Sequence, residues 1–141
     1  MRFFRIGCYL AFFTAALHMV GAHIVPALNP PVPSNEAERQ MLDLMQTTAL
    51  GLPGAPTHTM NDLMSGFSLL MSLNLALAGG LGLIIARRAV NDPLLLAASA
   101  RALAGAHLVA FVISLTRFFI IPSICFGAIA LAFAMASRNK S

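Results

Sequence analysis

The sequence predicts an all-α integral membrane protein, in which four transmembrane helices form an antiparallel bundle. Of the 141 residues, 58% are hydrophobic and only 10% are charged, whereas about 25% of the residues of a soluble domain are charged. The mean hydropathy is +0.80, and four apolar stretches each reach the roughly 20 residues that cross a hydrocarbon core. This composition excludes a disordered tail, a disulfide-stapled secreted module and a soluble nucleotide-binding domain.

The first predicted span covers residues 3–28 and ends at the proline-rich segment 29–33, because prolines lack the amide donors that a continuing helix requires. With Arg2 and Arg5 at its start, the same stretch also resembles a secretory signal peptide with a cleavage site at 20–22. We favour a retained span, since the apolar stretch is longer than a signal-peptide core and has a face of small residues. That face consists of Gly7, Ala11, Thr14, Ala15 and Ala22.

Residues 29–57 form the predicted outer loop, which contains one short amphipathic helix. Asn35 is suited to the N-cap of this helix, and Glu38 follows three residues later, at the spacing of a capping box. Its apolar side consists of Met41, Leu42, Leu44 and Met45. We expect the helix to end near Thr48, before the breaking segment 51–56, and to lie against the membrane or across the mouth of the bundle.

The remaining chain predicts spans at residues 58–85, 93–114 and 118–136, so that residues 1–141 form a single membrane domain. Asp92 and Pro93 predict a helix start, because Asp suits the cap and proline is favoured at the first helical position. The links between the last three spans are very short, which forces antiparallel neighbours.

Small residues recur along these spans at helical spacing, as is typical of contacting helices in membranes. They include Ser65, Ser68, Ser72, Ala76, Gly79 and Gly80 in the second span, and Ser123, Gly127, Ala130 and Ala134 in the fourth. The third span has small residues on nearly all of its faces, and we expect neighbouring helices to contact it on several sides.

The basic residues predict the orientation of the bundle. Six of the nine Lys and Arg residues flank spans on one side, namely Arg2, Arg5, Arg87, Arg88, Arg138 and Lys140. By the positive-inside rule, both termini and the loop 87–92 are therefore cytoplasmic, and 29–57 lies outside. Because the basic residues do not gather on one exposed face, nucleic acid is not an expected partner. Arg101, about 12 Å into its span, is expected to snorkel to the headgroups or to bond to helix-end carbonyls.

Histidines within the spans are candidate site residues, since ionisable groups that face lipid are costly. His18 shares the small-residue face of the first span, and His107 shares a face with Ala100 and Ala104. Both stand about 21 to 22 Å above the cytoplasmic ends of their helices, so contact is geometrically allowed. Two interpretations stay open: imidazoles that together bind a haem iron, a metal or a polar ligand, or buried histidines bonded to carbonyls or hydroxyls. We expect His23 on the opposite helical face, at the interface.

The densest polar patch of the sequence lies where the second span begins. Asp62 follows His58 by one helical turn, and both share a face with Ser65. A carboxylate at this spacing can orient the imidazole and raise its basicity. The patch is interpreted either as part of an outer-half site with the two span histidines, or as a helix cap in the stretch 57–62, where the helix dipole stabilises acidic groups.

Other site chemistries are not indicated. Cys8 and Cys125 are too few for a disulfide framework, and their expected heights place them beyond bridging distance, so we interpret them as small buried hydrophobes. Every glutamate lies in the outer loop. Small multidrug transporters depend on a membrane-embedded glutamate, so proton-coupled export by their mechanism is not expected.

The segment 60–67, Met-Asn-Asp-Leu-Met-Ser-Gly-Phe, together with the length, the span count and the histidine in the first span, resembles small bacterial four-span inner-membrane proteins of the DoxX-like kind. The resemblance covers most of the chain and implies a multi-pass protein of the bacterial inner (plasma) membrane. Members of such families are largely of unknown function, and some are associated with electron-transfer or quinone-linked complexes. No catalytic residue is transferred by this resemblance.

The sequence supports three functional hypotheses. In the first, a non-enzymatic protein has a polar outer-half cavity, lined by His18, Asp62, Ser65 and His107 with His58 at the rim, that binds a lipid, a quinone or a cofactor. In the second, the chain is a haem-bearing or quinone-linked oxidoreductase subunit, with His18 and His107 as ligands or acid–base groups. In the third, it is a structural subunit whose small-residue faces bind a membrane protein partner or a second copy. The sequence does not decide whether the protein is an enzyme, and it identifies no particular cofactor.

Overall fold

The computed structural model describes residues 1–51, 53–54, 57–118 and 120–138. Lys140 of the predicted cytoplasmic set lies outside the described residues, as do Leu52, Ala55 and Pro56 of the predicted break and Phe119 of the predicted fourth span. The described residues fold into helices, and the one β-type contact among them is an isolated bridge between Ala49 and Thr59.

Among the described residues, four helical segments are long and apolar enough to cross a membrane. They are Arg2–Leu28, Met60–Arg88 (α4), Pro93–Arg117 (α5) and Ile120–Arg138 (α6). The first consists of α1 (Arg2–Met19), a π-helical segment η1 (Val20–Ile24) and α2 (Val25–Leu28). The four predicted spans are confirmed as helices, with ends that differ by at most three residues. The largest differences are at the ends of α4 and α5, which continue to Arg88 and Arg117.

The predicted start of α5 is confirmed in detail. Pro93 is the first helical residue, and the side chain of Asp92 accepts a hydrogen bond of 2.9 Å from the amide of Leu95. This bond satisfies one of the amides that lack a partner in the first helical turn. Proline and the capping carboxylate thus act together, as their order in the sequence predicts.

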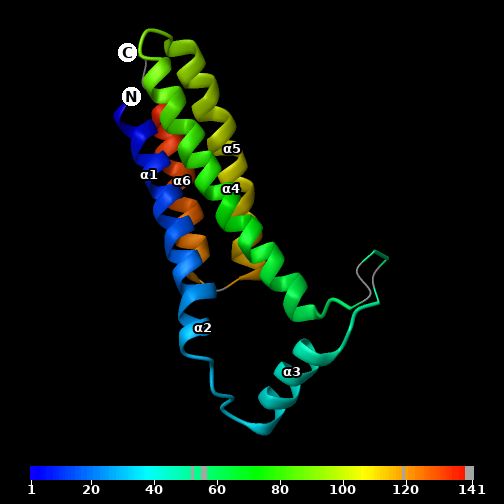
Figure 1. The fold of residues 1–141 in the computed structure, drawn as a ribbon. Helices are drawn as coiled ribbons and strands as arrows, with labels where there is room; N and C mark the ends of the chain where they lie inside the picture. The colour runs from blue at the N-terminus through cyan, green and yellow to red at the C-terminus, as the bar shows by residue number, and fades with distance from the viewer. Residues whose placement is uncertain (52, 55–56, 119, 139–141) are drawn as a thin grey trace. The chain divides into compact units, whose positions relative to one another are not determined.

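The chain divides into two compact units, one of residues 1–16 and 74–141 and the other of residues 17–73. In the first unit the start of α1, the end of α4, α5 and α6 run side by side (Figure 1). The N-terminus, the α4–α5 link and the end of α6 lie at the same end of this unit. Helices α1 and α4 each extend from one unit into the other. The antiparallel bundle expected from the sequence includes residues of both units, and it stays a prediction.

The core of the first unit depends on glycines that let helices approach closely. A Cβ atom at Gly79 would lie 2.8 Å from the backbone oxygen of Cys8, and one at Gly82 would lie 2.5 Å from its sulfur. A Cβ atom at Gly7 would lie 2.8 Å from the ring of Phe133, which is fully buried and packs edge-on against Phe4. The predicted contact role of Gly79 is confirmed, and Gly7 has the same role in α1.

Helix α5 has only one buried side in this structure. Ala100, His107 and Ser114 are buried and are spaced seven residues apart, so they form one stripe. Gly105 has open space where a Cβ atom would stand. The expectation that this helix is touched on several sides is therefore wrong for a single copy of the chain, because small residues also occupy its exposed face. Cys8 is buried and Cys125 half-buried, and both are free thiols.

The second unit contains α3 (Glu36–Thr47), the predicted amphipathic helix. Asn35 is its N-cap, since the Asn35 side chain accepts a 2.9 Å hydrogen bond from the amide of Glu38. The Glu38 carboxylate accepts hydrogen bonds from the amide of Ser34, at 2.7 Å, and from the Ser34 hydroxyl. The capping box is thus confirmed, with its return bond shifted by one residue to Ser34.

We expect substitution of Gly79 by Ala to destabilise the protein. The added methyl group meets a backbone oxygen that cannot rotate away, and overpacking of this kind costs about 1–3 kcal/mol. Gly105→Ala is the matched control, because its methyl group meets nothing within 4 Å and Ala is the better helix former. Thermal unfolding in detergent should show a lower Tm for Gly79→Ala and an unchanged or higher Tm for Gly105→Ala. Equal values for the two variants would contradict close packing at Gly79.

We also expect the start of α3 to weaken in acid. The hydrogen bonds from the hydroxyl and the amide of Ser34 lower the pKa of Glu38 from its ordinary value of 4.5. A lowered folded-state pKa contributes stability that is fully present above the unfolded value and is lost as the pH falls through the folded one. Amide exchange of residues 36–40 should therefore be slower in the wild type than in Glu38→Gln at neutral pH, and the difference should vanish in acid. A difference that is constant with pH would contradict the role of the carboxylate.

Candidate functional site

The candidate site depends on an irregular turn in the first helical segment. Residues 20–24 are π-helical, and the amide of Val25 donates to the carbonyl of Val20, five residues earlier. Pro26 explains this change, because it has no amide hydrogen for the carbonyl of Ala22 and its ring would clash with that carbonyl in an α-helix. One extra residue in the turn avoids the clash. Such π-helical turns occur frequently at functional sites.

The π-helical turn brings His18 and His23 to the same side of their helix. In a regular α-helix, residues five apart point about 140° away from each other, which is why His23 was expected on the opposite face. That expectation is wrong, because the Nε2 atoms of both rings lie within hydrogen-bonding distance of the hydroxyl of Ser68. The wider turn between the two histidines accounts for the difference.

The two imidazoles and the hydroxyl form a compact group, the His18–Ser68–His23 cluster. The Oγ atom of Ser68 lies 2.7 Å from Nε2 of His18 and 2.9 Å from Nε2 of His23. The two rings stand edge to face, with their centroids 6.1 Å apart. All three residues are half-buried and belong to the second unit. The Ser68 carbonyl oxygen also accepts a hydrogen bond of 3.3 Å from the hydroxyl of Ser72, one turn later in the same helix.

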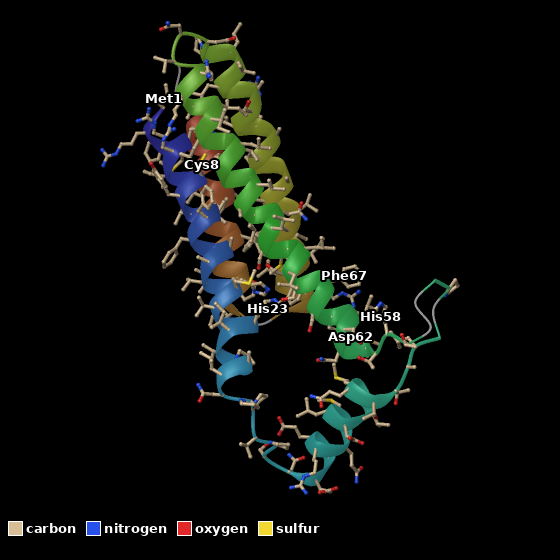
Figure 2. The ribbon with its side chains drawn as sticks, in the orientation of Figure 1. Met1, Cys8, His23, His58, Asp62 and Phe67 are labelled. Carbon is tan, nitrogen blue, oxygen red and sulfur yellow. The ribbon has the colours of Figure 1, made fainter. Side chains whose placement is uncertain are left out.

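Asp62 and His58 lie together at the start of α4 (Figure 2). Asp62 Oδ2 accepts hydrogen bonds of 2.9 Å from both the amide and the hydroxyl of Thr59, and the Asp62 amide donates to that hydroxyl at 3.2 Å. His58 Nδ1 is 3.9 Å from the same carboxylate oxygen, and both side chains are more than half exposed. The helix-cap interpretation is confirmed by this reciprocal bonding. Ser65 is half-buried one turn before Ser68, and its role in a shared site stays a prediction.

His107 lies in the first unit and has different surroundings. It is buried on α5 beside the rings of Phe126 and Phe133 on α6, with centroid distances of 6.4 and 5.7 Å. Its Nδ1 is 2.8 Å from the carbonyl oxygen of Leu103. A carbonyl only accepts, so Nδ1 carries the hydrogen, and in the neutral ring Nε2 is the acceptor. His18 and His107 are therefore bonded to a hydroxyl and to a carbonyl, as one of the two interpretations expected, and their pairing with each other stays a prediction.

The structure adds Ser68 and His23 to the residues that the sequence singled out for chemistry. Ser68 belonged to the small-residue face of its span, where its expected role was packing. The usable signal for His23 was Pro26, which stands in a run that is otherwise helical. Within the part of the chain that the structure describes, no three or more His, Cys, Asp and Glu side chains are placed to hold a metal ion.

Comparisons with protein-family models, with curated proteins and with solved structures give no match for this chain. The resemblance to DoxX-like proteins therefore stays a prediction.

Proposed function

We propose that this chain is a multi-pass membrane protein that binds the polar head of an amphiphilic ligand, a lipid, a quinone or a cofactor, at the His18–Ser68–His23 cluster. The observation that carries the proposal is the convergence of two imidazoles and one hydroxyl within helices apolar enough to cross a membrane. Polar groups at such depth are costly and are typical of functional sites. The cluster replaces the cavity lined by Asp62, His58 and His107 as the centre of the proposed site.

The chemistry of the surrounding surface favours a ligand with an apolar tail. Ser68 lies about 12 Å along α4 from Met60, so the cluster is beyond the first two turns of the helix. In the second unit, the same stretch of α4 exposes Met64, Phe67, Leu69, Leu70 and Leu73. No Cβ contact would form at Gly66, so this side of the helix is open. A ligand with a polar head at the imidazoles has apolar surface beside it for its tail.

The arginines support the predicted orientation, with both termini in the bacterial cytoplasm. One end of the first unit carries the N-terminus, the end of α6 and the α4–α5 link (Figure 1). Five arginines flank the helices there: Arg2, Arg5, Arg87, Arg88 and Arg138. Among the described residues, none of them has a carboxylate within ion-pairing distance, since the two pairs found are Arg39–Glu36 and His58–Asp62. The positive-inside rule then makes this end cytoplasmic and places 29–57 outside. Arg101 is exposed on α5, which suits snorkelling toward the same side.

The second and third hypotheses each have one supporting observation. The bond from His107 Nδ1 to the Leu103 carbonyl fixes the ring in the way that metal-ligating histidines are often fixed, with Nε2 left for an iron. The open, small-residue face at Gly105 on α5 would suit a second copy of the chain or another membrane helix. The three hypotheses predict different bound groups in the purified protein: an amphiphile for the first, a haem for the second, and a protein partner without a ligand for the third.

The orientation is tested by labelling single added cysteines from outside. Ser34→Cys lies in the predicted outer loop and Asn91→Cys in the predicted cytoplasmic link. In intact cells, a membrane-impermeant maleimide should label Ser34→Cys and not Asn91→Cys, with the wild type as the background control. Labelling of Asn91→Cys alone would invert the proposed orientation, and labelling of both would contradict a membrane crossing between them.

The ligand is tested by native mass spectrometry of protein extracted together with its lipids. We expect the wild type to retain an amphiphile, and Ser68→Ala or His18→Ala to retain about tenfold less, since losing about 1.4 kcal/mol of binding free energy changes affinity tenfold. Ser137→Ala is the control, because its hydroxyl donates only to the Ala134 carbonyl of its own helix, at 2.8 Å. Equal occupancy in all four proteins would contradict the proposal.

The same preparation separates the other two hypotheses. A bound haem whose Soret band disappears in His107→Ala would support the second hypothesis instead. A colourless dimer that carries no ligand would support the third.

A further inference from the structure

We propose that the His18–Ser68–His23 cluster relays a proton between its two imidazoles through the hydroxyl of Ser68. The relay concerns the same site as the proposed function, and it would serve a ligand whose polar head gives or takes a proton. Two features of the cluster support the relay: the number of hydrogens at the hydroxyl, and the lack of any bonded carboxylate among the residues that the structure describes.

The hydrogen count at Ser68 makes the two imidazoles unequal. A serine hydroxyl has one hydrogen to donate and two lone pairs to accept with. When its hydrogen points to one Nε2 atom, the other Nε2 atom must carry a hydrogen and donate it to the Ser68 oxygen. Both distances, 2.7 and 2.9 Å, are those of full hydrogen bonds. In the neutral cluster, one ring therefore donates through Nε2 and the other accepts there.

This asymmetry allows a balanced transfer. If His18 is the protonated ring, its Nε2–H bond breaks and the proton joins the Ser68 oxygen. The Ser68 O–H bond breaks in the same movement, and that hydrogen joins Nε2 of His23. His18 is then neutral, Ser68 is again a hydroxyl that points the other way, and His23 is protonated. One charge has moved from one ring to the other, no electron is transferred, and the reverse step is equivalent.

The charges around the cluster favour one extra proton rather than two. His58 and Asp62 are the nearest titratable residues of α4 in sequence, and they are paired with each other and with Thr59. In the outer loop, Glu36 pairs with Arg39, and Glu38 bonds to Ser34. No hydrogen bond or ion pair joins a described carboxylate to His18 or His23. With ring centroids 6.1 Å apart, two protonated imidazoles would repel each other without a countercharge between them.

The relay depends on the π-helical turn that Pro26 causes at this point of the helix. A single buried histidine can be satisfied by a carbonyl of its own helix, as His107 is by Leu103. His18 and His23 instead share one partner on α4, and this needs the extra residue of η1 to align them. Sharing the hydroxyl is unnecessary for burying two histidines, and it is what a proton transfer between them requires.

The test is ¹⁵N NMR of the full-length protein, labelled at the imidazole nitrogens, in lipid nanodiscs over a range of pH. In the wild type at about pH 8, above the ordinary imidazole pKa of about 6.5, one of the two rings should carry its hydrogen on Nε2 and the other on Nδ1. On acidification, both rings should shift with one shared midpoint, each by about half of the full change, because one proton exchanges between them. His58 and His107 serve as internal references.

Variants at Ser68 decide whether the hydroxyl is responsible. In Ser68→Ala, the two rings still repel each other, but the proton has no hydrogen-bonded path between them. Exchange between the rings should therefore slow, and their averaged ¹⁵N signals should broaden or separate into protonated and neutral signals. Ser68→Thr keeps the hydroxyl and should keep the averaged signals, which separates loss of the relay from loss of the fold. Ser137→Ala should behave as the wild type. Independent midpoints in the wild type, or averaged signals that stay sharp in Ser68→Ala, would overturn the relay.

The relay and the proposed function can fail separately. Rings that titrate independently in a wild type that still retains an amphiphile would overturn the relay and leave the ligand site. Coupled rings in a protein that retains no amphiphile would support the relay and contradict the ligand site.

Discussion

Within hydrocarbon, a polar group has no water to bond with, so its partner must come from the protein itself. The hydrogen bonds of the spans follow this constraint. Ser114 and Ser137 donate to carbonyls three residues earlier in their own helices, and His107 uses the carbonyl one turn before it. Among the described residues, no buried side-chain nitrogen or oxygen lacks a partner. The hydrogen bonds of the His18–Ser68–His23 cluster differ from these, because they join two different helical segments.

Small residues of α4 have different roles in the two units. In the first unit, glycines at positions 79 and 82 bring α4 close to Cys8, and the gain is van der Waals contact between helices. In the second unit, Ser68 lies on the same face of α4, and its small hydroxyl accommodates two imidazoles. A stripe that is uniform in the sequence thus packs helices in one half of α4 and holds polar groups in the other half.

Features that depend on neighbouring residues were predictable from the sequence. The caps at Asn35 and Asp92 and the cap at the start of α4 follow from a few adjacent side chains, and the spans follow from length and hydropathy. The exposed side of α5 was not predictable, because small residues look the same whether they meet a helix or lipid. A regular helix of 3.6 residues per turn predicts the wrong face for His23, because one proline changes that number locally. The contact of both histidines with Ser68 was not predictable, because it depends on how segments 45 and 50 residues apart in the sequence align side by side.

The π-helical turn makes the geometry of the His18–Ser68–His23 cluster depend on the number of residues in this stretch. Removal of one residue between Met19 and Val25 would restore the ordinary helical period and turn one histidine away, although no polar side chain would be altered. The cluster therefore depends on the number of residues in this stretch as much as on the histidines themselves. The pattern His-x4-His-x2-Pro, followed 45 residues after its second histidine by a serine, is a compact signature by which proteins with the same arrangement can be recognised among membrane proteins of unrelated appearance.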